Sequence, residues 1–271
     1  MRKVAYQSHG IKHGRINRMV SPSVAGELIK PFILLDYFEG VPKSGRGFGW
    51  HPHSGIATVS LVLDGKMNIK ENTGFEGVLT RGAVEYMQAG GAVWHTGFPN
   101  VGERNQGFQL WVALPPNLEE TEAFSHNLQA EEVTVKDNVR VILGEYLNAK
   151  FTINAPNDMN YLDVTIKGGD TWIYQPPQSH ETLWLQQYQG ETEEFSQGEV
   201  VVFEPSNEAI TLHANEDVKL VLGSAAKYEH DLIMGQYSVH TNQHALYNSE
   251  KRINEQYTAM VRKGIFENNA A

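Results

Sequence analysis

The chain has 271 residues, of which 41% are hydrophobic and 20% charged, so it can bury one large core or two medium ones. Its formal net charge is −10 and it has no run of lysine or arginine. This balance argues against direct binding to nucleic acid or to an anionic membrane surface. The chain contains no cysteine, which excludes disulfides, thiolate metal ligands and a cysteine nucleophile.

The N-terminal part predicts short strands separated by turns. Residues 1–15 lack the apolar core of a signal peptide, and no apolar run approaches the roughly 20 residues of a membrane span. We therefore expect a cytoplasmic protein without membrane contact. His9 and His13 lie in a polar segment and are expected to be solvated. An apolar run at 31–38 leads into a glycine-rich loop at 41–49, which we expect near the rim of a site.

Short apolar runs alternate with turn signals from residue 50 to residue 99, which predicts about five antiparallel strands joined by tight turns. His51 and His53 are two residues apart on an extended segment, so their imidazoles face the same side. If the strands curl into a barrel, His95 returns beside this pair. Three imidazole nitrogens suit iron, zinc, copper or nickel, although a His-x-His pair is more often part of a polar strand face.

Prolines and a polar, acidic run at 115–122 mark the end of the first unit. We therefore place the domain boundary at residue 125, which gives domains 1–125 and 126–271. No long helix is expected among the strands of the second domain. Strands are predicted there at 133–135, 139–143, 161–166, 171–174, 183–187, 200–203 and 218–223.

A weak internal repeat relates the two halves and predicts two similar β units in tandem. On the overlay, Gln178 takes the place of His53 and Thr211 that of His95. His180 and His213 lie near these positions but not on them. The sequence therefore favours a metal pocket in the first unit and a structural role for the second.

One helix is predicted at the C-terminal end. Ser249 can cap a run in which Ile253, Tyr257 and Met260 recur at helical spacing, and Gly264 suits a left-handed stop. We expect this helix to pack against a barrel.

Several motifs of the chain resemble the pirin family. HPHSG and GAVEYMQAGGAVWH resemble the family patterns HPHRG and GDVQWMTAG with its following histidine, and FQLWVALP resembles FQLWVNLP. PFILLDYFEG is similar to the family's FLLLDEF, and the match near the C-terminal end is looser. The resemblance implies an all-β fold of two tandem cupin-like barrels, of the double-stranded β-helix or jelly-roll type, with a short C-terminal helix. The strand and turn pattern agrees with it independently.

The resemblance also implies a metal site. Pirins bind one iron through the two histidines of HPH, a later histidine and a glutamate two residues beyond it, which corresponds here to His51, His53, His95 and Gly97. We expect Fe(II) at the three histidines, with zinc, nickel, copper or manganese as alternatives. The sequence indicates no further catalytic residue. Because Gly97 supplies no carboxylate, three neutral imidazoles would leave the full charge on the metal and favour an anionic, chelating substrate.

Two functions follow from the resemblance. Several pirins have quercetin 2,3-dioxygenase activity, which implies a small aromatic, flavonol-like substrate. One member is also a transcriptional cofactor, which implies the alternative of a non-catalytic regulator that acts through a protein partner and carries a degenerate metal pocket. In a third alternative the protein is a structural pseudoenzyme with an empty pocket.

Overall fold

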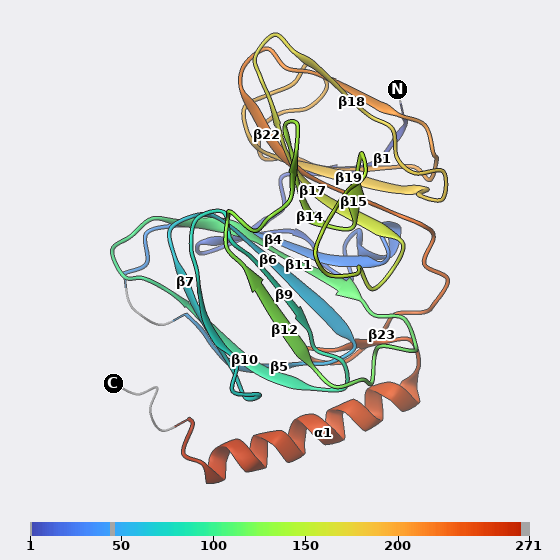
Figure 1. Cartoon of the computed structure of the whole chain (residues 1–271). Coiled ribbons are helices and arrows are strands. Elements are labelled where there is room, and N and C mark those ends of the chain that lie inside the picture. The colour runs from blue at the N-terminus through green and yellow to red at the C-terminus, as the bar shows by residue number, and fades with distance from the viewer. Residues whose placement is uncertain (1, 44–46, 267–271) are drawn as a thin grey trace. The chain divides into compact units, whose positions relative to one another are not determined.

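The computed structural model describes residues 2–43 and 47–266, and its contacts divide the chain into two units (Figure 1). Unit 1 comprises residues 1–36 and 131–229, and unit 2 comprises residues 37–130 and 230–271. Strand β4 (Phe32–Gly40) carries the chain from unit 1 into unit 2. The domain boundary at residue 125 stays a prediction.

Unit 1 is built from antiparallel strands. Its main sheet has the order β1-β20-β19-β22-β17-β14-β13, and β15-β16 and β18-β21 form two-stranded sheets. Strand β2 pairs with β3. A short 3-10 helix, η1 (Gly26–Leu28), follows β3. The strands are β1 (Val4–Ser8), β2 (Ile11–His13), β3 (Ile16–Val20), β13 (Val135–Lys136), β14 (Val139–Leu143), β15 (Glu145–Tyr146), β16 (Ala149–Lys150), β17 (Met159–Ile166), β18 (Thr171–Tyr174), β19 (Thr182–Gln189), β20 (Val200–Phe203), β21 (Ile210–His213) and β22 (Val218–Ala225).

Unit 2 contains two antiparallel sheets, one with the order β12-β9-β6-β11 and one with the order β5-β10-β7-β8. Figure 1 shows β5, β7 and β10 on one side of this unit and β6, β9, β11 and β12 on the other. Its strands are β5 (Phe48–His53), β6 (Ile56–Asp64), β7 (Met67–Glu71), β8 (Glu76–Leu79), β9 (Val84–Gln88), β10 (Val93–Pro99), β11 (Asn105–Ala113), β12 (Phe124–Leu128), β23 (Ile233–Met234) and β24 (Val239–His240).

The turn chemistry of unit 2 follows the sequence closely. Gly65 has φ +83 in the predicted turn between β6 and β7, and a Cβ atom there would lie 2.2 Å from the Arg104 carbonyl oxygen, so only glycine fits. The stretch 50–99 holds six strands in place of the expected five. Residues 44–46 of the predicted rim loop lie outside the described residues.

Helix α1 (Gln243–Arg262) begins earlier than the sequence predicted. The side chain of Asn242 caps it by accepting a hydrogen bond from the Ala245 N–H, whereas Ser249 is buried inside the helix. The prediction of a Ser249 cap was therefore wrong. Gly264 has φ +68 and its N–H donates to the Val261 carbonyl, which confirms the predicted stop.

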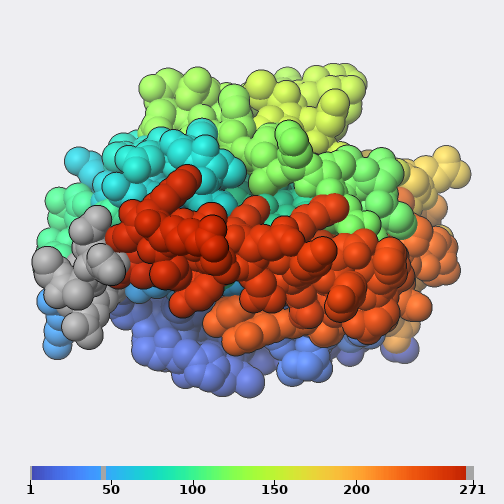
Figure 2. All heavy atoms as spheres, turned by 90° about the horizontal axis from the view of Figure 1, so that it is seen from below, coloured from blue at the N-terminus to red at the C-terminus, as the bar shows by residue number. Residues whose placement is uncertain are grey.

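The helix packs on the outer face of β10. The Trp94 Nε1–H donates to the Ile253 carbonyl oxygen, and the Trp94 ring lies 5.5 Å from the Tyr257 ring. Figure 2 shows α1 as a red band along one face of unit 2, beside the orange segment that holds β23 and β24. Among the described residues, no helix has both the length and the apolar character that crossing a membrane requires.

Candidate metal centre

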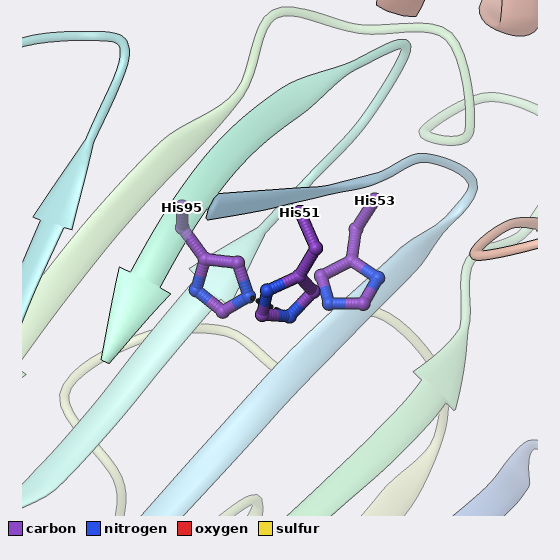
Figure 3. A group of neighbouring side chains, drawn as sticks. All are labelled: His51, His53 and His95. Carbon is purple, nitrogen blue, oxygen red and sulfur yellow. Dashed lines mark hydrogen bonds between the residues drawn. The ribbon is translucent and has the colours of Figure 1, made fainter. Parts of the chain in front are cut away.

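Three histidines meet on the inner side of unit 2. His51 and His53 lie on β5, and His95 lies on β10 directly opposite His51. Figure 3 shows the three rings turned toward one another. Ring centroids are 4.4 Å apart for His51 and His95 and 4.9 Å apart for the other two pairs, and one nitrogen from each ring lies within 4.8 Å of the others. The structure thus brings together the three residues that the sequence singled out.

Hydrogen bonds fix the tautomers of two of these rings. The Nδ1 atom of His51 is 2.7 Å from the Gly49 carbonyl oxygen, and that of His53 is 3.0 Å from the Tyr237 carbonyl oxygen. Because a carbonyl oxygen only accepts, each Nδ1 carries the hydrogen and each Nε2 keeps a lone pair. The His53 Nε2 is buried and has no hydrogen-bond partner among the described residues. A bound metal would satisfy this nitrogen, so the donor set fits a metal ion.

The third ring completes the set. His95 Nε2 lies 3.0 Å from His51 Nε2, so without a metal the His95 Nε2–H donates to the lone pair of His51 Nε2. Burial lowers the pKa of His51, lowers that of His53 to about 3 and holds that of His95 well below its ordinary value. All three imidazoles are therefore neutral at pH 7, the form in which histidine binds a metal.

Aromatic side chains surround the histidines. The Trp111 ring from β11 lies 4.8 Å from the His53 ring, and the Tyr237 and Phe48 rings lie 6.0 Å and 6.4 Å from the His51 ring. The Trp111 Nε1 is buried without a hydrogen-bond partner in the described part of the chain. Trp111 belongs to the motif FQLWVALP, in which no residue was predicted to line the site.

A buried carboxylate that sequence analysis did not single out lies opposite His95. Glu71 on β7 pairs with His95, and its oxygens accept hydrogen bonds from Thr73 and Ser125. Burial raises the pKa of this carboxyl group, although both hydrogen bonds lower it. Alternation along β7 could have indicated that Glu71 points inward. The buried residues of this strand are every second one, and Glu71 lies on the same face as Met67.

Gly97 follows His95 on the same face of β10. The register of β10 against β7 is regular, with Gly97 opposite the buried Ile69. The atoms nearest to a Cβ at Gly97 would be Met67 Sδ at 3.5 Å, and the Asn68 carbonyl oxygen and Met67 Cγ at 4.0 Å. The inner face therefore has room for a Cβ atom at this position.

A buried network holds the segment that supplies the Tyr237 carbonyl. The Ser54 Oγ lies 2.9 Å from His240 Nε2, and His240 Nδ1 lies 3.2 Å from Glu119 Oε2. Ser54, Glu119 and His240 are each at most 2% exposed, so this trio has no access for a substrate and serves to position His53, the neighbour of Ser54. Sequence analysis gave none of these three residues a role in the site.

Unit 1 contains a second group of three donor residues, Glu193, Glu194 and His213. Their donor atoms lie within 4.8 Å of one another, but His213 Nδ1 bonds Glu194 Oε1 at 2.6 Å and the side chain of His213 is half exposed. This ion pair on the surface satisfies its own members. Both ring nitrogens of the buried His180 are also engaged, by Asp158 and Ser224, so neither is open to a metal.

Comparison of the structure with solved structures identifies its class. It matches a quercetin 2,3-dioxygenase from Acinetobacter baumannii over 98% of both chains, with a TM-score of 0.82 and 22% identity. It matches a bacterial pirin from Escherichia coli in complex with nickel(II) over 84% of this chain and 98% of the other, with a TM-score of 0.66 and 18% identity. The fold is that of a bicupin, which confirms the predicted all-β architecture of two cupin-like barrels with a C-terminal helix.

Sequence comparison identifies the family. Residues 13–112 match the family model of Pirin. The chain is 33% identical over 186 residues to a pirin-like protein from Caulobacter vibrioides, a match that covers 65% of this chain and 67% of that protein. The chain therefore belongs to the pirin family. Two pirin proteins of Arabidopsis thaliana match at 32% identity over 53% and 57% of their own length, so the chain spans little more than half of those relatives.

Proposed function

We propose that this chain is a metal-dependent dioxygenase of the quercetinase type. The observation that carries the proposal is the set of three neutral imidazoles whose nitrogens converge inside unit 2, with His53 Nε2 buried and unsatisfied. The metal would be held by His51, His53 and His95. When bound there, Fe(II) supplies a centre at which dioxygen and an electron-rich substrate react, and both oxygen atoms enter the organic product.

The protein residues would select the substrate through charge and shape. The nearest inward position beyond His95 on β10 is Gly97, which adds no negative charge to the three neutral ligands. An enolate-type hydroxyl beside a carbonyl, as in a flavonol, would supply that charge and two oxygen donors. The rings of Trp111, Tyr237 and Phe48 offer flat apolar surfaces for the planar substrate.

Oxygen uptake tests the proposal. Protein purified without chelators or a histidine tag is loaded with Fe(II) under anaerobic conditions, mixed with quercetin and exposed to oxygen. We expect uptake that requires both iron and quercetin and that is lost in His53→Ala. His126→Ala is the matched control, because His126 is exposed on β12 and should retain full uptake. Iron-loaded protein that consumes no oxygen with quercetin would refute the dioxygenase.

Gly97 favours one second candidate, a metal-binding regulator without catalysis. The pirin resemblance aligns Gly97 with the family's glutamate, so the pocket would retain histidine ligands but lack the usual charge. A regulator of this kind would bind metal at near-equal stoichiometry and show no oxygen uptake. Elemental analysis combined with the uptake assay separates it from the dioxygenase, and absence of metal after anaerobic loading would indicate the pseudoenzyme.

A further inference from the structure

Unit 1 contains a cavity of ≈ 610 Å³ that has no part in the metal centre. It lies at the β15–β16 hairpin and the start of β17, within the size range of small-molecule sites. Residues that line it include Tyr146, Asp158, Asn160, Tyr174 and His180. Polar and aromatic side chains thus share one concave surface.

A chain of buried hydrogen bonds forms the polar base of this cavity. Asn160 Nδ2 lies 3.4 Å from the Tyr174 hydroxyl, which lies 2.7 Å from Ser224 Oγ. Ser224 Oγ lies 2.8 Å from His180 Nδ1, and His180 Nε2 lies 2.9 Å from Asp158 Oδ1. One direction of donation is consistent throughout: Asn160 Nδ2–H donates to the Tyr174 hydroxyl, Tyr174 to Ser224, and Ser224 to His180 Nδ1. The His180 Nε2–H then donates to Asp158.

Asp158 ends this chain at the mouth of the cavity. Its side chain is 62% exposed, and its two oxygens accept one hydrogen bond each, from His180 and from Ser179. Partial burial would raise the pKa of Asp158, but these two hydrogen bonds lower it overall, so the carboxylate is ionised. A carboxylate offers about four acceptor sites, so the Asp158 oxygens can accept further donors from a ligand.

Stacked aromatic rings form one wall. The ring of Tyr146 lies 6.4 Å from that of Tyr174 at an interplanar angle of 20°, and Tyr174 lies 5.8 Å from Trp172 at 19°. Tyr146 is half-buried, whereas Trp172 and Tyr174 are buried. Tyr146 and Tyr174 both line the cavity, so a ligand ring there can contact an aromatic side chain.

The hairpin tip beside this wall is a tight two-residue turn. Leu147 has φ +45 and Asn148 has φ +67, and the Leu147 side chain is 58% exposed. A two-residue hairpin turn of this type requires positive φ at both central residues. Leu147 and Ile173 both line the cavity, where their side chains can make apolar contact with a ligand.

We infer that this cavity binds a small aromatic amine, with its ammonium group on Asp158 and its ring against Tyr146. No lysine or arginine is among the lining residues, so an anionic ligand would meet the Asp158 charge without compensation. A cation would instead be held by the carboxylate and by the faces of the tyrosine rings. The inference concerns unit 1 and does not depend on the function proposed for unit 2.

Calorimetry and ligand-detected NMR with tyramine test the inference on the full chain. 4-Hydroxyphenylacetate has the same ring and hydroxyl with the opposite charge, so it serves as the matched ligand control. We expect tyramine to bind and the acid to bind at least about tenfold more weakly. Asp158→Asn should weaken tyramine binding about tenfold or more, and Tyr146→Ala should weaken it several-fold.

Two further variants distinguish this site from other sources of binding. Asp170→Asn removes an exposed carboxylate of the same unit outside the cavity, and it should leave tyramine affinity unchanged. His53→Ala should also leave it unchanged, because the metal centre has no part in this site. The inference is overturned if tyramine shows no binding up to about 10 mM. It is equally overturned if the acid binds as well, or if Asp158→Asn and Tyr146→Ala, both folded by circular dichroism, bind tyramine like the parent protein.

Discussion

Replacing Gly97 by glutamate should tighten metal binding in unit 2. His95 and Gly97 are two residues apart on a strand whose pairing with β7 is regular, so a side chain at 97 points to the same face as His95. The nearest atoms to a Cβ there are Met67 Sδ at 3.5 Å and the Asn68 oxygen at 4.0 Å, which are ordinary contacts. Gly97 also has no positive φ, so the substitution carries no backbone strain.

The size of the effect follows from the ligands already present. Three neutral imidazoles leave the +2 charge of the metal uncompensated, and a carboxylate adds charge and an oxygen donor. Changes outside the ligand set alter metal affinity about 10–100-fold, so a new ligand should gain at least that, or about 1.4–2.7 kcal/mol. Anaerobic titration of the metal-free protein with Fe(II), by competition against a chelator of known affinity, measures this difference.

Gly97→Gln is the matched control. It introduces nearly the same volume without the charge, so it should gain much less affinity than Gly97→Glu. Equal gains in the two variants would show that filling space, rather than the added charge, tightens the site. Unchanged or weaker Fe(II) binding in Gly97→Glu would show that position 97 does not face the metal, or that another group already fills the fourth position.

Three further predictions concern single buried residues. His53→Ala should abolish metal binding while the metal-free variant unfolds as cooperatively as the metal-free parent; loss of cooperativity in calorimetry would indicate a core role instead. Burial raises the pKa of Glu85 to about 7 despite its hydrogen bond from Ser60, so folding favours the protonated form and stability falls as pH rises from 4.5 through 7. The free energy of unfolding of Glu85→Gln, relative to the parent protein, should therefore be up to about 3 kcal/mol more favourable to the folded state at pH 8 than at pH 4. Thermal unfolding measures this difference, and a difference that stays constant with pH would contradict the prediction. Glu119→Ala should cost about 3 kcal/mol in denaturant unfolding, because it leaves the buried His240 Nδ1 and the Thr241 N–H without their carboxylate partner. Glu122→Ala should cost almost nothing, because Glu122 is exposed.

Strands were predictable where apolar runs are long and bounded by turns. The predicted ranges 139–143, 171–174 and 200–203 coincide with β14, β18 and β20. The β15–β16 hairpin was missed because each strand has two residues, too few to show a period. Strand β21, which has four residues and pairs with β18, was also missed.

Pairing between distant segments was not predictable from local pattern. Strand β1 joins the sheet of unit 1 by pairing with β20, and nothing in the order of the chain indicates that partner. The start of α1 was misplaced because Asn242 precedes residues of mixed polarity, whereas the apolar period becomes regular only after Ser249.

The histidines of the site were predictable and most of their surroundings were not. The spacing of His51 and His53 and the return of His95 follow from strand period and from the pirin motifs. The Tyr237 backbone carbonyl that orients His53 has no signature in a sequence, because every residue carries a carbonyl group.

The link between His53 and Tyr237 has a consequence for how the protein is made. The two residues are 184 positions apart, and at about 5–20 residues per second the ribosome needs on the order of 10–40 s to add the second after the first. During that interval the imidazole of His53 is not held in its final tautomer, whatever strands have already paired. A metal bound by His53 in this final geometry would therefore be acquired only after synthesis of the C-terminal segment.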